Sequence, residues 1–502
     1  MEGKTIIIIG GGFAGLSAGI YAQMNGYRTQ IFEMAGLPGG LCTAWKRGGY
    51  TIDGCIHWLV GSSPKSQLYQ FWQEVGVLPG REIINLEAYE CFEGADGRTL
   101  TLYCDVNRLE KHLLEFSPQD APLIRKFIHG IRLCLALDEP APPGRLGRLM
   151  RNLKMGLLFA RRGRELQTWM QTTAEDFASR FKDPLIRTAF KEMWFPEFSM
   201  LFMLYTFAYL HKQDAGYPIG GSLPMSRALE KRYLELGGRI HYHCRVEKIL
   251  VENDCAVGVR LADGSEHRAN RVISAADGHA TIFEMLEGKY ADEKVREPYE
   301  KWQVFPGLLY VGLGVKRTFE EAPKTVAGLS FPLKEAVELG SEVVERLRVH
   351  LFHHDPTLAP PGKTSVVVML PNRYDYWKEL AQDRAAYDEK KEQIKRTVVS
   401  LLEQRFPGIG ADVEMVDVST PLTFERYTGN WQGSFEGWLL TPQNAQVMLK
   451  PMSQTLPGLQ RFYLCGQWVE PGGGLPTAVM SARRLLQAIC QEDGEKFTAR
   501  TA

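Results

Sequence analysis

The sequence predicts an α/β protein with α+β inserts, and the first indication is the order of elements at its start. Residues 5–9, Thr-Ile-Ile-Ile-Ile, are typical of a strand that is buried on both faces of a parallel sheet. The glycine-rich turn Gly10–Gly15 follows at once, and residues 16–24 have a helical pattern. Residues 28–32 are the next predicted strand, with Glu33 at its end. This order is that of the first unit of a Rossmann-type sheet.

The glycine-rich turn has the spacing that a dinucleotide requires. Gly10 permits a tight turn, Gly12 lets the backbone approach a pyrophosphate, and Gly15 lets the helix pack closely on the strand. Phe13 and Ala14 then stand at a helix N-terminus, where free N–H groups and the helix dipole favour phosphate. Such turns also occur for structural reasons alone, but the complete unit favours a dinucleotide site.

Glu33 is placed to accept hydrogen bonds from the ribose of the dinucleotide, because it ends the second strand 18 residues after Gly15. This residue by itself does not distinguish FAD from NAD.

Composition excludes several other classes of protein. Lys plus Arg equals Asp plus Glu, at 59 each in 502 residues, so no overall charge favours nucleic acid. The nine cysteines are scattered without a CxxC motif, which predicts neither a disulfide framework nor a metal site. A cytoplasmic location is expected, since the first strand begins within a few residues and leaves no room for a signal peptide.

A second glycine-rich turn lies near the other end of the chain. Residues 462–466, Phe-Tyr-Leu-Cys-Gly, are a predicted strand, and residues 471–476, Pro-Gly-Gly-Gly-Leu-Pro, lead into a predicted helix from Thr477 to about Cys490. A helix N-terminus of this kind can place N–H donors against the pyrimidine edge of a flavin, which carries negative charge when reduced.

Taken in order, the motifs of the chain resemble those of one flavoprotein family. Gly216–Ser222 resembles its YPxGG turn, residues 245–251 resemble the strand whose valine touches adenine, and residues 273–277 resemble its SNADP-like strand end. The segments 37–40, 49–54, 355–362 and 420–424 also have counterparts. The family is that of phytoene desaturase, carotenoid isomerase and all-trans-retinol saturase, within the amine-oxidase-like FAD flavoproteins.

The resemblance implies non-covalent FAD, held by a Rossmann-type domain of the glutathione-reductase/amine-oxidase kind. No cysteine or histidine matches a flavin-linking position. Beyond the first unit, the residues that the resemblance implies for FAD binding are Gly40, Leu41, Val246, Ala275, Gly466, Gln467, Gly474 and Leu475. Gln467 departs from the acidic residue of most relatives, which leaves its contact open.

The segment Asp53–Trp58 resembles the saturase form, which has a Gly-Ile-His sequence there. His57 and Trp58 are therefore the candidate catalytic residues, although packing or hydrogen bonding is the alternative role of His57. The pair His241 and His243 is predicted to share one face of a strand, and His353 and His354 to point to opposite faces of a strand end. All four are interpreted as structural, because no third metal ligand lies near the first pair.

No second nucleotide-binding unit is found, since residues 312–314 lie inside a predicted strand and residues 408–410 follow a helix. A dedicated NAD(P)H domain is therefore not expected. Electrons are expected to pass through a quinone, oxygen, a reductant in solution or the substrate itself.

The FAD-binding domain is predicted to be discontinuous, with residues 1–70, 215–290 and 455–495 contributing to it. The inserts form the substrate domain, largely helical over 71–214 and of mixed sheet and helix over 295–454. Residues 139–144 are the clearest linker.

Two segments of the helical insert have apolar patterns. Residues 145–164 carry seven basic and no acidic side chains around a leucine-rich face, which is typical of a helix at a membrane surface; a solvated helix is the alternative. Residues 193–210 are predicted to form a buried aromatic helix that lines a substrate channel or belongs only to the core.

These features predict an FAD-dependent oxidoreductase that acts on carbon–carbon bonds of a polyene, isoprenoid or related lipid. Desaturation, saturation and redox-assisted isomerisation all remain open. The alternatives are a flavin amine oxidase of the same fold and a prenyl-lipid-binding protein without a flavin. The intact glycine turn disfavours the second alternative.

Overall fold

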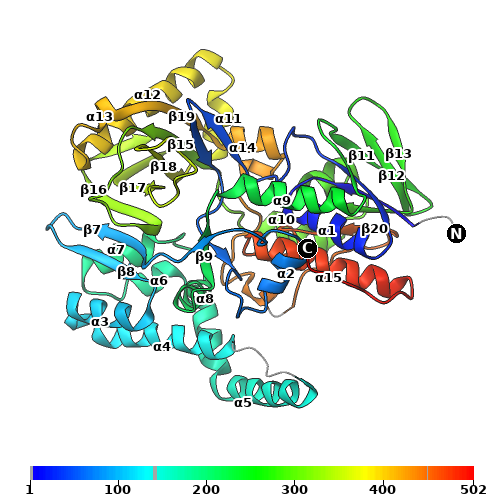
Figure 1. Cartoon of the computed structure of the whole chain (residues 1–502), viewed down its shortest axis with the longest axis horizontal. Helices are drawn as coiled ribbons and strands as arrows, with labels where there is room; N and C mark the ends of the chain where they lie inside the picture. The colour runs from blue at the N-terminus through cyan, green and yellow to red at the C-terminus, as the bar shows by residue number, and fades with distance from the viewer. Residues whose placement is uncertain (1–3, 139–143, 449) are drawn as a thin grey trace.

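The core of one half of the molecule is a parallel sheet assembled from three distant stretches of the chain (Figure 1). The computed structural model describes residues 4–138, 144–448 and 450–502, and for residues 144–155, 158 and 159 it describes the backbone only. The strand order is β10-β2-β1-β14-β20, and every neighbouring pair is parallel. The strands are β1 (Thr5–Ile9), β2 (Arg28–Phe32), β10 (Arg239–His241), β14 (Arg271–Ser274) and β20 (Phe462–Leu464).

Both faces of this sheet are covered, which explains the unbroken apolar run of β1. Ile6 and Ile8 pack with the helices on one face, whereas Ile7 and Ile9 pack with a small antiparallel sheet on the other. The helices are α1 (Phe13–Met24), α9 (Ser222–Glu235) and α15 (Leu475–Glu492). The small sheet contains β11 (Val246–Glu252), β12 (Cys255–Leu261) and β13 (Glu266–Arg268). The predicted α/β fold is confirmed.

The second large sheet has seven strands and joins the two inserts. Its order is β19-β15-β18-β17-β16-β7-β8, and the link between the inserts is the parallel pair of β16 and β7. Its strands are β7 (Ala88–Glu93), β8 (Thr99–Tyr103), β15 (Leu308–Val315), β16 (Thr325–Leu339), β17 (Glu342–Leu351), β18 (Thr364–Pro371) and β19 (Val413–Ser419). The helices of this lobe are α11 (Tyr374–Leu380), α12 (Arg384–Arg405), α13 (Ile409–Asp412) and α14 (Pro421–Thr428).

The first insert is otherwise helical, as predicted. Its helices are α3 (Val106–Phe116), α4 (Ala121–Leu137), α5 (Gly144–Gln171), α6 (Ala174–Ala178), α7 (Pro184–Glu192) and α8 (Met200–His211). The predicted linker lies outside the described residues, except for Gly144. In Figure 1, α5 lies at the edge of the molecule.

The prediction of one helix over residues 193–210 is wrong. α7 ends at Glu192 and α8 begins at Met200, so residues 193–199 form an irregular connection. Pro196 lies in the middle of this connection. Proline has no backbone N–H, so it could not donate the hydrogen bond that a residue in the interior of a helix makes.

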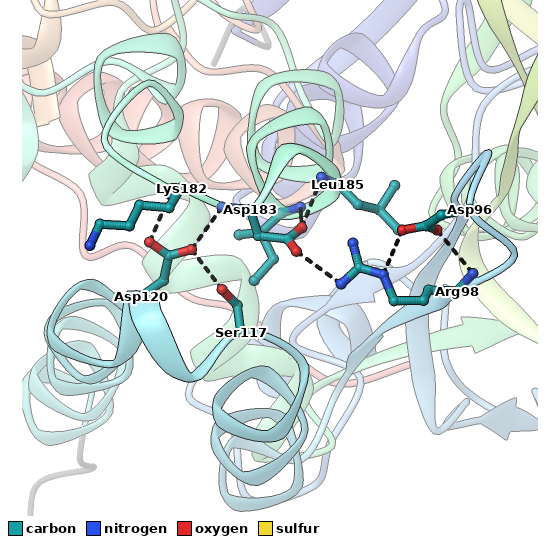
Figure 2. A network of polar contacts seen from close by, with 8 residues as sticks. Asp96, Arg98, Ser117, Asp120, Lys182, Asp183 and Leu185 are labelled. Atoms are coloured by element: carbon teal, nitrogen blue, oxygen red, sulfur yellow. Dashed lines mark hydrogen bonds and ion pairs between the residues drawn. The ribbon is translucent and has the colours of Figure 1, made fainter.

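A buried polar network fixes the helices of the insert against one another (Figure 2). Asp120 accepts hydrogen bonds from Ser117 Oγ at 2.7 Å and from the backbone N–H groups of Lys182 and Asp183 at 2.8 and 3.0 Å. Asp183 is the N-cap of α7, and its carboxylate pairs with the Arg98 guanidinium at 2.9 Å. These bonds satisfy two carboxylates that are less than 5% exposed.

The remaining elements connect the two halves. They are β3 (Ala44–Arg47), β4 (Tyr50–Asp53), β5 (Leu59–Val60), β6 (Ile83–Ile84), β9 (Ala215–Pro218), α2 (Tyr69–Glu74), α10 (Glu293–Lys301) and the short helical turns Pro118–Asp120, Ala280–Met285, Trp431–Gly433 and Ala445–Met448. No helix within the described ranges is long and apolar enough to cross a membrane.

Candidate flavin site

The first glycine turn has the geometry that its spacing predicts. Gly10 has a φ of +94°, in the region that favours glycine. A Cβ atom at Gly15 would collide with the Gly10 carbonyl, so close packing of α1 on β1 requires glycine there. Gly12 is the N-cap of α1, and a Cβ atom at Gly12 would have no neighbour nearer than 3.8 Å. A side chain at Gly12 would therefore fill the space in front of the helix N-terminus.

Glu33 is held at the end of β2 by the backbone. Its Oε2 accepts the Gly11 N–H at 2.6 Å and its Oε1 accepts the Ala35 N–H at 2.7 Å. Burial raises the pKa of this carboxyl, and these backbone donors oppose the shift. Each oxygen retains a lone pair that a ribose hydroxyl could use.

The second glycine turn lies beside the first. Gly466, which follows β20, has a φ of +101°, and a Cβ atom there would lie 3.1 Å from Ala14. Gln467 donates from Nε2 to Asn430 Oδ1 at 3.2 Å, a contact the sequence left open. Gly474 is the N-cap of α15 and Leu475 is the first helical residue, two positions earlier than the predicted start.

One cavity of about 1240 Å³ connects these pieces. It is lined by every predicted FAD-binding residue except Gly15, whose role is in packing, and also by His57 and Trp58. Beyond the glycine turns its wall becomes aromatic, with Trp58, Trp194, Phe195, Phe202, Tyr205, Phe305 and Phe435. The irregular segment 193–199 and α8 both contribute to this wall.

His57 lines the cavity and packs against a strand of the seven-stranded sheet. Its ring centroid is 4.4 Å from that of His350 on β17, and burial lowers the pKa of His57 to about 4. His57 is therefore neutral at physiological pH. Trp58 packs edge-on against Trp194, with ring centroids 5.5 Å apart.

A buried ion pair lies behind this histidine. Arg348 Nε contacts Glu90 Oε1 at 2.6 Å, and Glu90 is fully buried. Sequence reasoning did not identify Arg348, Glu90 or His350, because β7 and β17 are separated by about 250 residues and no motif marks them.

Glu436 is a further cavity residue that sequence reasoning missed. Its carboxyl accepts a hydrogen bond from the Gly474 N–H at the start of α15 and leaves no room for a Cβ atom at Gly473. Burial raises the pKa of this carboxyl to about 8. The only signal was an acidic residue between Phe435 and Gly437 in an otherwise apolar segment.

The other histidines do not form the arrangements predicted. β10 ends at His241, and His243 lies beyond it with a φ of +56°, so the two do not share a strand face. His353 and His354 follow the end of β17 rather than belonging to it. Among the described residues, no group of three His, Cys, Asp or Glu side chains could hold a metal ion.

The fold and the cavity define a flavoprotein oxidoreductase, and comparison with known proteins agrees. Residues 13–490 match the family model described as flavin containing amine oxidoreductase. The chain belongs to this family. It is an FAD-dependent oxidoreductase.

Curated relatives are similar over most of the chain. A chloroplastic prolycopene isomerase of Daucus carota is 26% identical over 95% of this chain and 78% of its own length. A lycopene-forming phytoene desaturase of Pseudescherichia vulneris is 25% identical over 97% of this chain and 99% of its own. These relatives agree with the resemblance found in the motifs.

Solved structures share the fold. Cyclohexylamine oxidase from Brevibacterium oxydans IH-35A superposes with a TM-score of 0.59 at 15% identity, over 98% of this chain and all of its own. An oxidoreductase from Methanosarcina mazei gives a TM-score of 0.58 at 17% identity, over 96% of this chain and all of its own.

Proposed function

We propose that this protein oxidises, reduces or isomerises carbon–carbon bonds of a polyene or related isoprenoid lipid. The observation that carries the proposal is the single cavity, in which a nucleotide cradle opens directly into an aromatic chamber. Transfer of an apolar chain from water into a chamber with such walls is favourable, because its apolar surface is buried. Relatives named phytoene desaturase and prolycopene isomerase support this substrate class.

In this proposal the two glycine turns hold FAD at opposite ends. The α1 N-terminus and Gly12 bind the pyrophosphate, and Glu33 binds the adenosine ribose. Gly466, Gln467 and the N-terminus of α15 hold the flavin end. The other predicted residues that line the cavity, Phe13, Ala14, Gly40, Leu41, Val246, Ala275 and Leu475, complete the cradle.

The chain's own contribution is to position the substrate and exclude water. FAD, when bound, supplies a two-electron acceptor or donor. Trp58 and Trp194 hold the double bonds in the aromatic chamber, and neutral His57 offers a ring nitrogen to a carbon that loses a proton. This is the role proposed for His57 and Trp58 as catalytic residues.

Three further features belong to the proposal. The FAD domain comprises residues 1–70, 215–290 and 455–495, and the remainder forms the substrate domain. The protein touches a membrane surface through residues 145–164, from which a lipid reaches the cavity. A quinone or other small redox partner exchanges electrons with the flavin.

The test is anaerobic mixing of oxidised and reduced holoprotein with a panel of polyenes and amines. The flavin absorbance should change with at least one polyene and with no amine. Reduction by an amine alone would instead assign the chain to amine oxidation, the alternative function of this fold. A protein purified without acid-releasable FAD would contradict both.

A further inference from the structure

Cys42 and Cys55 face each other across the hairpin of β3 and β4. Ala44 pairs with Asp53, and the Gly54 N–H donates to the Thr43 carbonyl at 3.0 Å, so the next facing pair is Cys42 and Cys55. Directly opposite residues of an antiparallel pair share one face, so the Cys42 and Cys55 side chains lie on the same side of the hairpin. Facing residues of antiparallel strands have Cα atoms about 4.5–5.5 Å apart, and a disulfide spans roughly 4.4–6.8 Å.

Both thiols line the cavity that contains the flavin cradle. Cys42 lies three residues after Gly39, whose N–H donates to the Gly11 carbonyl at 2.9 Å, so the hairpin is attached to the first glycine turn. The Cys42 thiol donates to the Ser222 carbonyl oxygen, with a sulfur–oxygen distance of 3.8 Å.

Glu436 is a carboxyl that lines the same cavity as the two thiols. Its charge contributes to raising the pKa of Cys55, and its own pKa of about 8 allows both protonation states near neutrality. Asp53 also lies near Cys55, but its oxygens already accept Ser222 Oγ and the N–H groups of Cys55, Ile56 and Ser222. For Glu436, the Gly474 N–H is the one hydrogen-bond donor that opposes the rise of its pKa on burial.

We propose that Cys42 and Cys55 are a redox-active dithiol/disulfide couple that exchanges two electrons with the flavin. When their Sγ–Sγ bond forms, the two thiols release two electrons and two protons. Both electrons and one proton pass to the oxidised flavin, and the other proton passes to the Glu436 carboxylate. The reverse step breaks the disulfide. The inference rests on the flavin site proposed above and adds a second two-electron store beside it.

The electron capacity of the holoprotein tests this couple. Anaerobic titration of fully oxidised protein with dithionite should take up four electrons per FAD in the wild type. Cys42→Ser and Cys55→Ser should each take up two. Cys104→Ser removes a buried thiol in the helical lobe and should leave the value at four. Uptake of two electrons per FAD by the wild type would overturn the proposal.

A second measurement does not require the flavin. Treatment of FAD-free protein with diamide should remove two titratable thiols and yield a peptide pair linked through Cys42 and Cys55, which reduction should separate. A protein that holds no FAD would contradict the flavin site, whereas an absent link would contradict the couple alone.

The role of Glu436 has its own readout. Glu436→Gln should retain the four-electron capacity but slow electron transfer between dithiol and flavin at pH 7 by at least about a hundredfold, the lower end of the range for a positioned acid–base group. An unchanged rate would remove Glu436 from the proposal.

Discussion

A side chain at Gly12 should prevent cofactor binding. Gly12→Val should abolish FAD binding, because its branched side chain would project into the space in front of the α1 N-terminus. Equilibrium dialysis with FAD measures the loss. Gly163→Val is the matched control: Gly163 lies in helix α5 with open space around it, so that variant should bind FAD normally. Full occupancy in the Gly12 variant would mean that the pyrophosphate lies elsewhere.

Asp277 connects stability to pH. Burial raises its pKa from 3.8 to about 7, while it accepts the N–H groups of Ala280 and Trp431 at 2.8 Å each. Because the folded pKa exceeds the unfolded one, this group's contribution is complete below pH 3.8 and is lost as pH rises through 7. The shift of the Asp277 pKa corresponds to a total loss on the order of 4 kcal/mol.

Asp277→Asn should therefore reduce the fall in the free energy of unfolding between pH 5 and pH 8, measured with urea on the FAD-free protein. Asp263→Asn is the control, since Asp263 is exposed and its pKa is lowered, so it is ionised throughout this range. Equal pH dependence in the wild type and the Asp277 variant would contradict the assignment.

At the scale of single residues, the predicted FAD-binding residues lie together where a local motif marks them. All of them except Gly15 line the cavity, because glycine turns at strand ends have a geometry set by nearby residues. Glu436 and Arg348 were not predicted, because only tertiary packing brings them to the cavity, and the contact of His350 with His57 arises in the same way.

The helix α15 provides a test at the scale of elements. Its unpaired N–H groups should stabilise the negative charge that a flavin gains on reduction. Leu475→Asp should therefore lower the flavin reduction potential by roughly 30 mV, which for two electrons corresponds to about 1.4 kcal/mol. Dye equilibration measures it.

Leu475→Asn is the control for this helix, because asparagine has nearly the same shape as aspartate but carries no charge. It should leave the potential near that of the wild type. A Leu475→Asp protein that holds FAD with an unshifted or raised potential would show that α15 does not face the flavin.

Periodic elements were predicted more accurately than irregular ones. The bounds of α3 and α4 follow from apolar periodicity and from the turn at Ser117 to Asp120. Within the aromatic run 193–210, Ser199 is the N-cap of α8, and this start signal was not used in the prediction, so the irregular first part of the run was not foreseen. The pairing of β7 with β16 could not be predicted from the apolar periodicity of either strand, because the two strands are more than 200 residues apart in the sequence.

For the molecule as a whole, the predicted membrane contact can be measured directly. Replacing Arg148, Arg151 and Lys154 with Gln should weaken binding to anionic vesicles by about 1 kcal/mol per charge. Added salt should have the same effect by screening. Replacing Arg384, Lys390 and Lys395 of α12 with Gln is the control, which should leave vesicle binding unchanged. A wild-type protein that ignores anionic vesicles at low salt would make residues 145–164 a solvated helix.

The parallel sheet also constrains how this chain matures during synthesis. β1 and β2 leave the ribosome first, but their sheet is completed only by β20, which begins at Phe462. At roughly 5–20 residues per second, that interval lasts on the order of half a minute or more. Meanwhile β14 keeps an open edge, and the face of α1 that α15 covers stays uncovered. These surfaces are exposed to aggregation during that interval, and FAD can be captured at both ends only after α15 has emerged.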